Sequence, residues 1–300
     1  MRNHRNTAPI LRDQVIAIFK HVHIGSIVTR RAYLAVALRF VDFIGEEFGL
    51  LKLKNLDERH LTAYVIHLQQ KGLSASTVKK EISAIRYLHD QVSGAQNRLP
   101  SNDELSVELE RRMFSDKDRA WSQDEFLCIV SVSIAHGFPD YACACVLGRY
   151  VGMRISEVFR LDRNTAEKAI KAGEIAVKGK GGLIRTVPLC TEAKNALQYM
   201  MRVTPRGRKL FVPDHMRTHS AINRLETFIA KHRGEVLDPG DIRNLTFHGL
   251  RHRFASDAYM YYRDKGYDRL SARLKVARLI GHNRDDVTDI YIKSAKKEGH

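Results

Sequence analysis

Apolar residues recur at helical spacing through most of this chain, and that periodicity restricts its fold more than any other feature. In residues 29–49 the apolar positions that share one helical face are Tyr33, Ala37, Phe40, Val41 and Ile44. Two similar runs follow, and Ser74 or Ser76 can cap the second of them. We expect residues 29–112 to form a small helical bundle, with a weaker fourth helix over residues 103–112.

The second half of the chain is also mainly helical, with one interruption. Ser122 and Glu125 have the spacing of a capping box, which predicts a helix start. Residues 173–189 instead read GEIAVKGKGGLIRTVPL, two short β-like runs around a glycine-lysine turn, which is typical of a hairpin. Helical periodicity resumes at Thr191. We expect a mainly helical α+β unit with one small sheet.

Chain length indicates two domains, because a single core rarely extends beyond about 250 residues and this chain has 300. The polar run MFSDKDRA at residues 113–120 lacks apolar periodicity, so we expect the linker there. Residues 1–28 read as an N-terminal extension with one short helix. The expected domains are then a helical one at 29–112 and a larger one at 121–300.

The formal charge of +16 indicates a polyanionic partner. Residues 1–100 hold 15 Lys and Arg against 8 Asp and Glu, and residues 121–300 hold 31 against 20. Both large segments are basic, so we expect both to touch the same polyanion. There is no apolar run of membrane-spanning length and no CxxC pair among the four cysteines. We therefore expect a soluble, cytoplasmic, nucleoid-associated protein without a membrane partner.

Six short motifs follow one another along the chain: GLSASTVKKEISAIRYL, GMRISEVFRL, KGKGGLIRTVPL, HGLRHRFA, LIGH and DVTDIY. In this order they resemble the tyrosine recombinases, the phage-integrase and Xer-type family of site-specific DNA recombinases. The resemblance covers residues 29–292. It implies a helical, SAM-like DNA-clamping domain followed by an α+β catalytic domain, the two forming a C-shaped clamp around duplex DNA.

Arg154 in GMRISEV matches the family's first catalytic arginine, and Arg251 in HGLRH matches the second. A guanidinium is permanently charged and offers a planar fork of donors, which suits the oxygens of a phosphate that gains charge. His248 lies three residues before Arg251, so the two share a helical face. It matches the histidine that accepts and returns the nucleophile's proton. We interpret Glu157 as an orienting partner or a structural ion pair, and His252 as structural.

Three further site residues follow from the resemblance. Lys180 in the hairpin turn matches the general acid that protonates the departing 5′ oxygen, and Lys178 is the alternative. Either lysine could instead contact a backbone phosphate. His282 in LIGH matches the position that hydrogen-bonds the scissile phosphate. Tyr291 matches the nucleophile, whose attack forms a 3′-phosphotyrosyl link that a 5′-hydroxyl can reverse. The reaction implied needs no metal and no cofactor.

The partners implied are double-stranded DNA at specific recombination sites, a homotetramer in the synaptic complex, and accessory DNA-bending proteins. Two alternatives remain open, a type IB topoisomerase-like enzyme that relaxes DNA and a catalytically inactive DNA-binding relative. A metal nuclease built on His248, His252 and His282 is disfavoured, because no carboxylate lies beside them at ligand spacing. Residues 261–275 form a stretch longer than in the simplest members. We expect it to reach toward DNA or a neighbouring protomer, or to be a loop extension.

Overall fold

The structure is a computed structural model of the 300-residue chain, and it describes residues 6–111, 119–179, 182–238 and 240–281. The chain forms two compact units, residues 1–115 and residues 116–300. Within the described ranges, none of the helices combines the length and the apolar character that a bilayer crossing requires.

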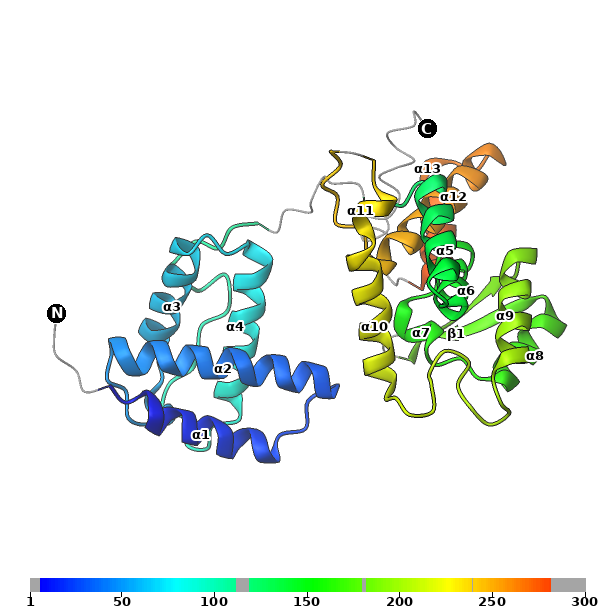
Figure 1. The fold of residues 1–300 in the computed structure, drawn as a ribbon. Coiled ribbons are helices and arrows are strands. Elements are labelled where there is room, and N and C mark those ends of the chain that lie inside the picture. Colours follow the sequence, from blue (N-terminus) through cyan, green and yellow to red (C-terminus); the bar gives the residue numbers. More distant parts are fainter. Residues whose placement is uncertain (1–5, 112–118, 180–181, 239, 282–300) are drawn as a thin grey trace. The chain divides into compact units, whose positions relative to one another are not determined.

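The N-terminal unit is a helical bundle. Its elements are α1 (Ala8–His21), α2 (Ile27–Glu47), the 3₁₀ turn η1 (Leu53–Asn55), α3 (Glu58–Gln70) and α4 (Ala75–Asp90). α1 and α2 lie alongside each other, and α3 and α4 cross them (Figure 1). Ser26, Asp57 and Ser74 cap α2, α3 and α4, because the side chain of each accepts a hydrogen bond from a backbone N–H of the first turn.

α1 lies within the span that we expected to be an N-terminal extension. It contributes Leu11, Val15 and Phe19 to the core of the N-terminal unit. The contact with α2 is close, because a Cβ at Gly45 would lie only 2.4 Å from the backbone nitrogen of Ala8. α1 is therefore an integral helix of this unit.

The prediction of a weaker helix over residues 103–112 is wrong, because residues 103–111 form turns, bends and chain without regular secondary structure. Leu105, Val107 and Leu109 are half-buried, and the residues between them are exposed. In a helix, side chains three or four residues apart share a face, whereas residues two apart do not. The spacing of these three residues therefore suits a strap laid on the core better than a helix.

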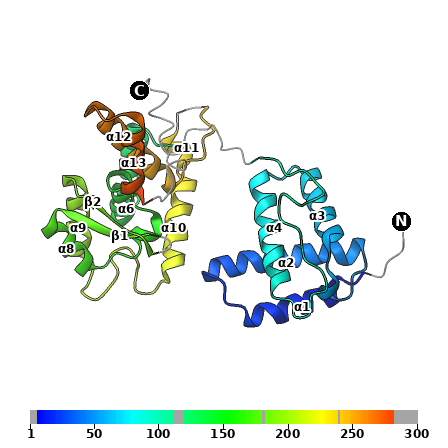
Figure 2. The ribbon, with the colours of Figure 1, turned by 180° about the vertical axis from the view of Figure 1, so that it is seen from behind.

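The C-terminal unit is mainly helical and contains a small sheet. Its elements are α5 (Gln123–Ala135), α6 (Pro139–Tyr150), α7 (Ile155–Val158), α8 (Arg163–Ala172), β1 (Glu174–Lys178), β2 (Ile184–Pro188), α9 (Thr191–Val203), α10 (Thr218–Lys231), α11 (Arg233–Val236), α12 (Phe247–Asp264) and α13 (Arg269–Ile280). β1 and β2 pair antiparallel, and this hairpin lies beside α8 (Figure 2). The expected hairpin and the capping box of Ser122 and Glu125 are confirmed.

Residues 261–275 are not a loop extension, which excludes one of the alternatives given for them. They form the end of α12, a turn and the start of α13. Ala272, Val276 and Ile280 of α13 pack with Ala255 and Tyr259 of α12 in an apolar cluster. The four-residue spacing of the α13 positions places them on one helical face. Residues 261–275 therefore belong to the packed helix pair of α12 and α13.

Candidate active site

The start of α12 carries His248 and Arg251 and is held in place by Trp121. The Trp121 indole N–H donates a hydrogen bond of 2.9 Å to the carbonyl oxygen of Thr246, the residue before the helix. Gly249 permits this contact, because a Cβ there would lie 2.6 Å from Trp121 Cδ1. The helix that carries both predicted residues is thus fixed against the beginning of the C-terminal unit.

Arg251 is fully buried and joins three segments of the chain. Its guanidinium donates to the carbonyl oxygen of Gly152, two residues before Arg154, and to that of Ile280 at the end of α13. A buried guanidinium requires such acceptors, because an unsatisfied charged donor in the interior is costly. Arg251 therefore brings α12, the turn before Arg154 and the end of α13 to one place.

The turn at Gly152 requires glycine for two reasons. Its φ of +62° lies in the left-handed region that favours glycine. In addition, a Cβ at this position would lie 2.3 Å from Cδ1 of Phe254 on α12. The turn therefore packs directly on α12, which allows its carbonyl oxygen to meet Arg251.

Arg154 precedes α7 and is held by Glu157. Its Nη1 donates to Glu157 Oε1 at 2.8 Å, and its backbone N–H donates to Oε2 at 2.7 Å. Arg185 on β2 donates to the same two oxygens, at 3.0 and 2.7 Å. The side chains of Glu157 and Arg185 are 1% and 3% exposed, whereas that of Arg154 is 26% exposed. Of the three, Arg154 is the side chain that solvent or a ligand can reach.

The Glu157 carboxylate stays ionised despite its burial. Burial raises the pKa of this carboxyl, but the hydrogen bonds and positive charges of Arg185 and Arg154 outweigh it and lower the pKa to about 2. The group therefore carries a full negative charge between two guanidinium groups near neutral pH. This arrangement fits the orienting role that we expected for Glu157 as well as a structural ion pair.

His248 has an environment that keeps its imidazole neutral. Desolvation by the surrounding protein lowers its pKa most, followed by the positive charges of Arg251, Arg154 and Arg119, and the pKa falls to about 4. The residue is nevertheless exposed on one side to solvent, and its ring packs edge-to-face on His252 with centroids 5.1 Å apart. Near pH 7 His248 is therefore in the form that can accept a proton.

Three predicted site residues lie outside the described part of the chain: Lys180, His282 and Tyr291. The residues directly before the first two are described. A Cβ at Gly179 would lie 3.5 Å from Arg154 Nη1, and one at Gly281 would lie 3.1 Å from Arg185 Cδ. Gly152, Arg154, Glu157, Arg185 and Arg251 are joined by hydrogen bonds into one arginine cluster. The chain segments that lead into Lys180 and His282 thus both reach this arginine cluster.

Lys178, the alternative to Lys180, is the last residue of β1, and its side chain is on the exposed face of the strand. Side chains of β1 alternate, so Ile175 and Val177 are buried and Lys178 is exposed. The same alternation on β2 buries Arg185, which pairs with Val177. Lys178 therefore lies on the face of the hairpin opposite to the one that carries Arg185.

Gly152 and Arg185 are the two residues of this cluster that sequence reasoning missed. The signal for Arg185 was present in LIRTVPL, where period-two alternation puts it on the same side as the buried Val187. An arginine on the apolar face of a strand requires a buried acceptor such as a carboxylate. The signal for Gly152 was weaker, since a glycine before Met153 indicates only a turn.

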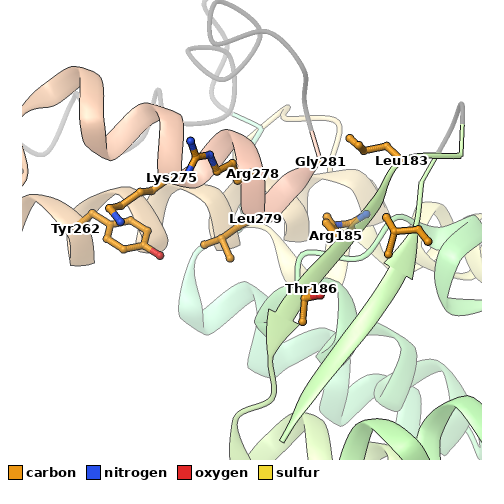
Figure 3. A pocket seen from close by; sticks show the side chains of 9 residues that line it. Leu183, Arg185, Thr186, Tyr262, Lys275, Arg278, Leu279 and Gly281 are labelled. Carbon is orange, nitrogen blue, oxygen red and sulfur yellow. The ribbon is translucent and has the colours of Figure 1, made fainter. Parts of the chain in front are cut away.

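An open cavity of about 420 Å³ lies between β2 and the helices α12 and α13 (Figure 3). Its lining consists of Leu183, Ile184, Arg185, Thr186, Tyr262, Lys275, Arg278, Leu279 and Gly281. The Lys275 ammonium lies 5.4 Å from the ring centroid of Tyr262 and 4.5 Å from that of Tyr267. The lining is therefore basic and partly aromatic, and it shares Arg185 and Gly281 with the arginine cluster.

Within the described residues, one group of side chains has ligand atoms close enough to hold a metal ion. His136, His232 and Glu235 place one such atom each within 4.8 Å of one another. His232 Nδ1 donates to Glu235 Oε1 at 2.6 Å, and the rings of His136 and His232 both pack on Phe228. Hydrogen bonding and ring packing account for these contacts. The group includes none of the predicted catalytic residues.

Comparison with known proteins places the sequence in a family. Residues 122–298 match the Phage integrase family, and residues 25–92 match the Phage integrase N-terminal SAM-like domain. The chain belongs to the phage integrase family. This family member is 29% identical over 263 residues to the tyrosine recombinase XerC of Pseudomonas putida, which covers 82% of the chain and 79% of that relative. It is 27% identical over 250 residues to XerD of Oceanobacillus iheyensis, covering 79% and 77%.

Solved structures of two integrases share the fold. The Tn1549 transposon integrase in complex with a circular intermediate DNA aligns with a TM-score of 0.66 at 14% identity, over 96% of this chain and 98% of that one. The lambda integrase dimer bound to a COC′ core site aligns with a TM-score of 0.65 at 15% identity, over 94% and 76%. The expected fold class, a SAM-like helical domain followed by an α+β domain with a small sheet, is confirmed.

Proposed function

We propose that this phage integrase family member is a site-specific DNA recombinase that cuts and rejoins DNA with Tyr291 as its nucleophile. Its curated relatives are tyrosine recombinases. One observation carries the proposal for the site. Arg154 is distant in the sequence from His248 and Arg251, yet the positive charges of both arginines act on the His248 imidazole, and Arg251 donates to the carbonyl oxygen of Gly152, two residues before Arg154.

In the proposed reaction, Arg154 binds the non-bridging oxygens of the scissile phosphate. Its partly exposed guanidinium supports this role. Arg251 adds a second positive charge beneath the site. Among the nearby charges, that of Arg251 lowers the pKa of His248 the most. His282 adds a hydrogen bond to the phosphate. Two guanidinium charges would stabilise the negative charge that accumulates on phosphorus oxygens in the transition state.

Bond formation and bond breakage balance without an external energy source. The Tyr291 phenol gives its proton to the neutral His248 imidazole, and its oxygen attacks phosphorus. The bond from phosphorus to the 5′ oxygen breaks, and Lys180 supplies the proton to that oxygen. The 3′-phosphotyrosyl link keeps the phosphodiester's energy, so a 5′-hydroxyl reverses the steps without ATP. The outward position of Lys178 supports Lys180 as the acid.

The assembly that we propose follows from counting strands. Exchange between two duplexes requires four strand cleavages, and the proposed site offers one tyrosine per chain, so a homotetramer bound to two duplexes supplies one nucleophile per strand. Both units then contribute basic surface to double-stranded DNA. Accessory DNA-bending proteins remain part of this proposal. Crosslinking on paired DNA sites, followed by mass measurement, tests the tetramer.

Covalent capture tests the proposed function even while the DNA site is unidentified. The protein is incubated with fragmented genomic DNA carrying random nicks, and SDS-stable protein–DNA adducts are recovered and sequenced. We expect adducts to gather at one sequence, with the protein on a 3′ phosphate and with yields insensitive to a chelator. Tyr291→Phe should form none. Tyr261→Phe, a change at an exposed tyrosine of the same unit, should match the unchanged protein.

Each of the other outcomes contradicts the assigned nucleophile or favours one of the alternative functions. Adducts that persist in Tyr291→Phe would contradict the assigned nucleophile. Absence of any adduct from the unchanged protein would favour an inactive DNA-binding relative. Relaxation of supercoiled DNA without recombinants, on a plasmid with two copies of the recovered site, would favour the topoisomerase-like alternative.

A further inference from the structure

Arg185 is a buried charged residue on the apolar face of a two-stranded sheet. Its side chain is 3% exposed, and its two terminal nitrogens donate to both Glu157 oxygens at 3.0 and 2.7 Å. The Glu157 side chain is 1% exposed. Such a pair is poor evidence of stabilisation, because removing two charges from water costs about as much as their attraction returns. Its position beside Arg154 points to a different purpose.

Glu157 is shared between two guanidinium groups. Each of its oxygens accepts one hydrogen bond from Arg185 and one from Arg154. One negative charge therefore faces two positive charges. If Arg185 were absent, Glu157 would be balanced by Arg154 alone, and the charge that Arg154 offers to a phosphate would be largely cancelled.

Arg185 also contacts the other segments of the candidate site. Its Nη2 lies 3.4 Å from the carbonyl oxygen of Gly152, the same oxygen that accepts from Arg251. Its Cδ lies 3.1 Å from where a Cβ of Gly281 would be, and Figure 3 shows the Arg185 side chain on β2 next to Gly281. The hairpin, the Gly152 turn and the end of α13 therefore all meet at this side chain.

We infer that Arg185 is a positioning residue that neutralises Glu157, so that Arg154 keeps its position and its full positive charge for the scissile phosphate. The inference rests on the proposed function, because it gives Arg154 a phosphate to bind. A bidentate guanidinium suits this task, since its planar fork fixes the carboxylate while it balances the charge. Glu157 then orients Arg154 without neutralising it.

The test compares two DNA substrates that differ in one charge. Single-turnover cleavage is measured at saturating concentrations of a nicked duplex carrying the site recovered by covalent capture. The scissile group is either a phosphate or an uncharged methylphosphonate. We expect Arg185→Met to slow cleavage of the phosphate by about tenfold or more, because a transition-state charge loses its partner. On the methylphosphonate we expect a deficit of less than about threefold, because little charge needs stabilising.

Two further variants separate positioning from folding. Arg163→Met is the matched control, since Arg163 also donates to backbone carbonyls in this unit but lies outside the cluster. We expect it to cleave both substrates like the unchanged protein. Arg185→Lys keeps the positive charge and should cleave the phosphate faster than Arg185→Met. If Arg185→Met does not fold, as judged by circular dichroism, the two-substrate comparison is made with Arg185→Lys.

The outcomes distinguish this inference from the proposed function. Cleavage by the unchanged protein with an equal deficit of the Arg185 variants on both substrates would overturn the inference, because a loss of folded protein acts on both alike. Full activity of Arg185→Met on the phosphate would overturn it too. Absence of cleavage by the unchanged protein would instead contradict the proposed function.

Discussion

His248 illustrates how neighbouring residues set the chemistry of one side chain. Its surroundings desolvate it, and the nearby charges of Arg251, Arg154 and Arg119 are all positive, so its pKa falls to about 4. A histidine with a pKa near its ordinary value of about 6.5 would be partly protonated near neutral pH. The lowered pKa therefore leaves the base form present without help from a carboxylate.

This shift predicts the pH dependence of cleavage. At subsaturating DNA the second-order rate constant reports groups of the free enzyme, so it should not decline as pH falls through about 6.5. At saturating DNA the bound phosphate's negative charge should raise the His248 pKa and move the acidic decline to higher pH. Single-turnover rates across pH at both DNA concentrations test this. A decline near pH 6.5 at low DNA that disappears in His248→Gln would contradict it.

At the residue scale, the sequence predicts chemistry better than it predicts contacts. Motif order indicated Arg154, His248 and Arg251 as site residues, and the structure brings these three together. The sequence did not indicate that Arg251 is fully buried against two carbonyls. Burial depends on which distant segments pack on α12, and no local pattern around Arg251 carries that information.

The contact between α1 and α2 shows how one residue can determine the packing of a whole helix. Helix propensity alone says that Gly45→Ala should stabilise α2 by about 1 kcal/mol. The structure predicts the opposite sign. A Cβ at Gly45 would lie 2.4 Å from the nitrogen and 2.6 Å from the Cα of Ala8, and both are backbone atoms. α1 would have to move away from α2.

We therefore expect Gly45→Ala to lower the free energy of unfolding of the N-terminal unit by about 1–3 kcal/mol, the usual cost of overpacking. Urea unfolding followed by circular dichroism measures the change. Gly234→Ala is the matched control, because Gly234 is exposed in α11 and a Cβ there would meet nothing within 4 Å. The control should show no loss, and an unchanged or raised stability in Gly45→Ala would refute the packing of α1 on α2.

At the element scale, helices and the hairpin were predictable wherever the period of apolar residues was unambiguous. Residues 29–49, 122–135 and 173–189 are examples. The weak helix predicted at residues 103–111 did not form, because the apolar residues there recur with a period of two. The sequence also left residues 261–275 open, because the apolar face of α13 is narrow and packs on α12, far from any local pattern.

At the scale of the whole molecule, positive charge in both large segments implies strong electrostatic attraction to DNA. Each phosphate contact releases counterions, so affinity should fall steeply with salt. If six to ten phosphates are contacted, we expect affinity to drop by about 10³–10⁵ between roughly 50 and 200 mM salt. Fluorescence anisotropy with a labelled duplex measures this. An affinity that changes by less than about tenfold would show that few phosphates are bound.

The contacts between distant segments that hold the site together could not be predicted from the sequence. Gly152, Arg185, Arg251 and Ile280 lie in four separate segments, and the hydrogen bonds that join them depend on the packed tertiary structure. The resemblance predicted which residue types belong together. Only the packed unit shows that one carbonyl oxygen, that of Gly152, lies within hydrogen-bonding reach of two arginines.

The two carbonyl partners of Arg251 also have a consequence during protein synthesis. One lies 99 residues before it in the chain and the other lies 29 residues after it. While Ile280 is still inside the ribosome, the guanidinium lacks the carbonyl partner at the end of α13. A nascent or truncated chain that ends before Ile280 therefore lacks one of the hydrogen bonds that fix Arg251, so we expect the proposed phosphate site to form only after translation has passed this residue.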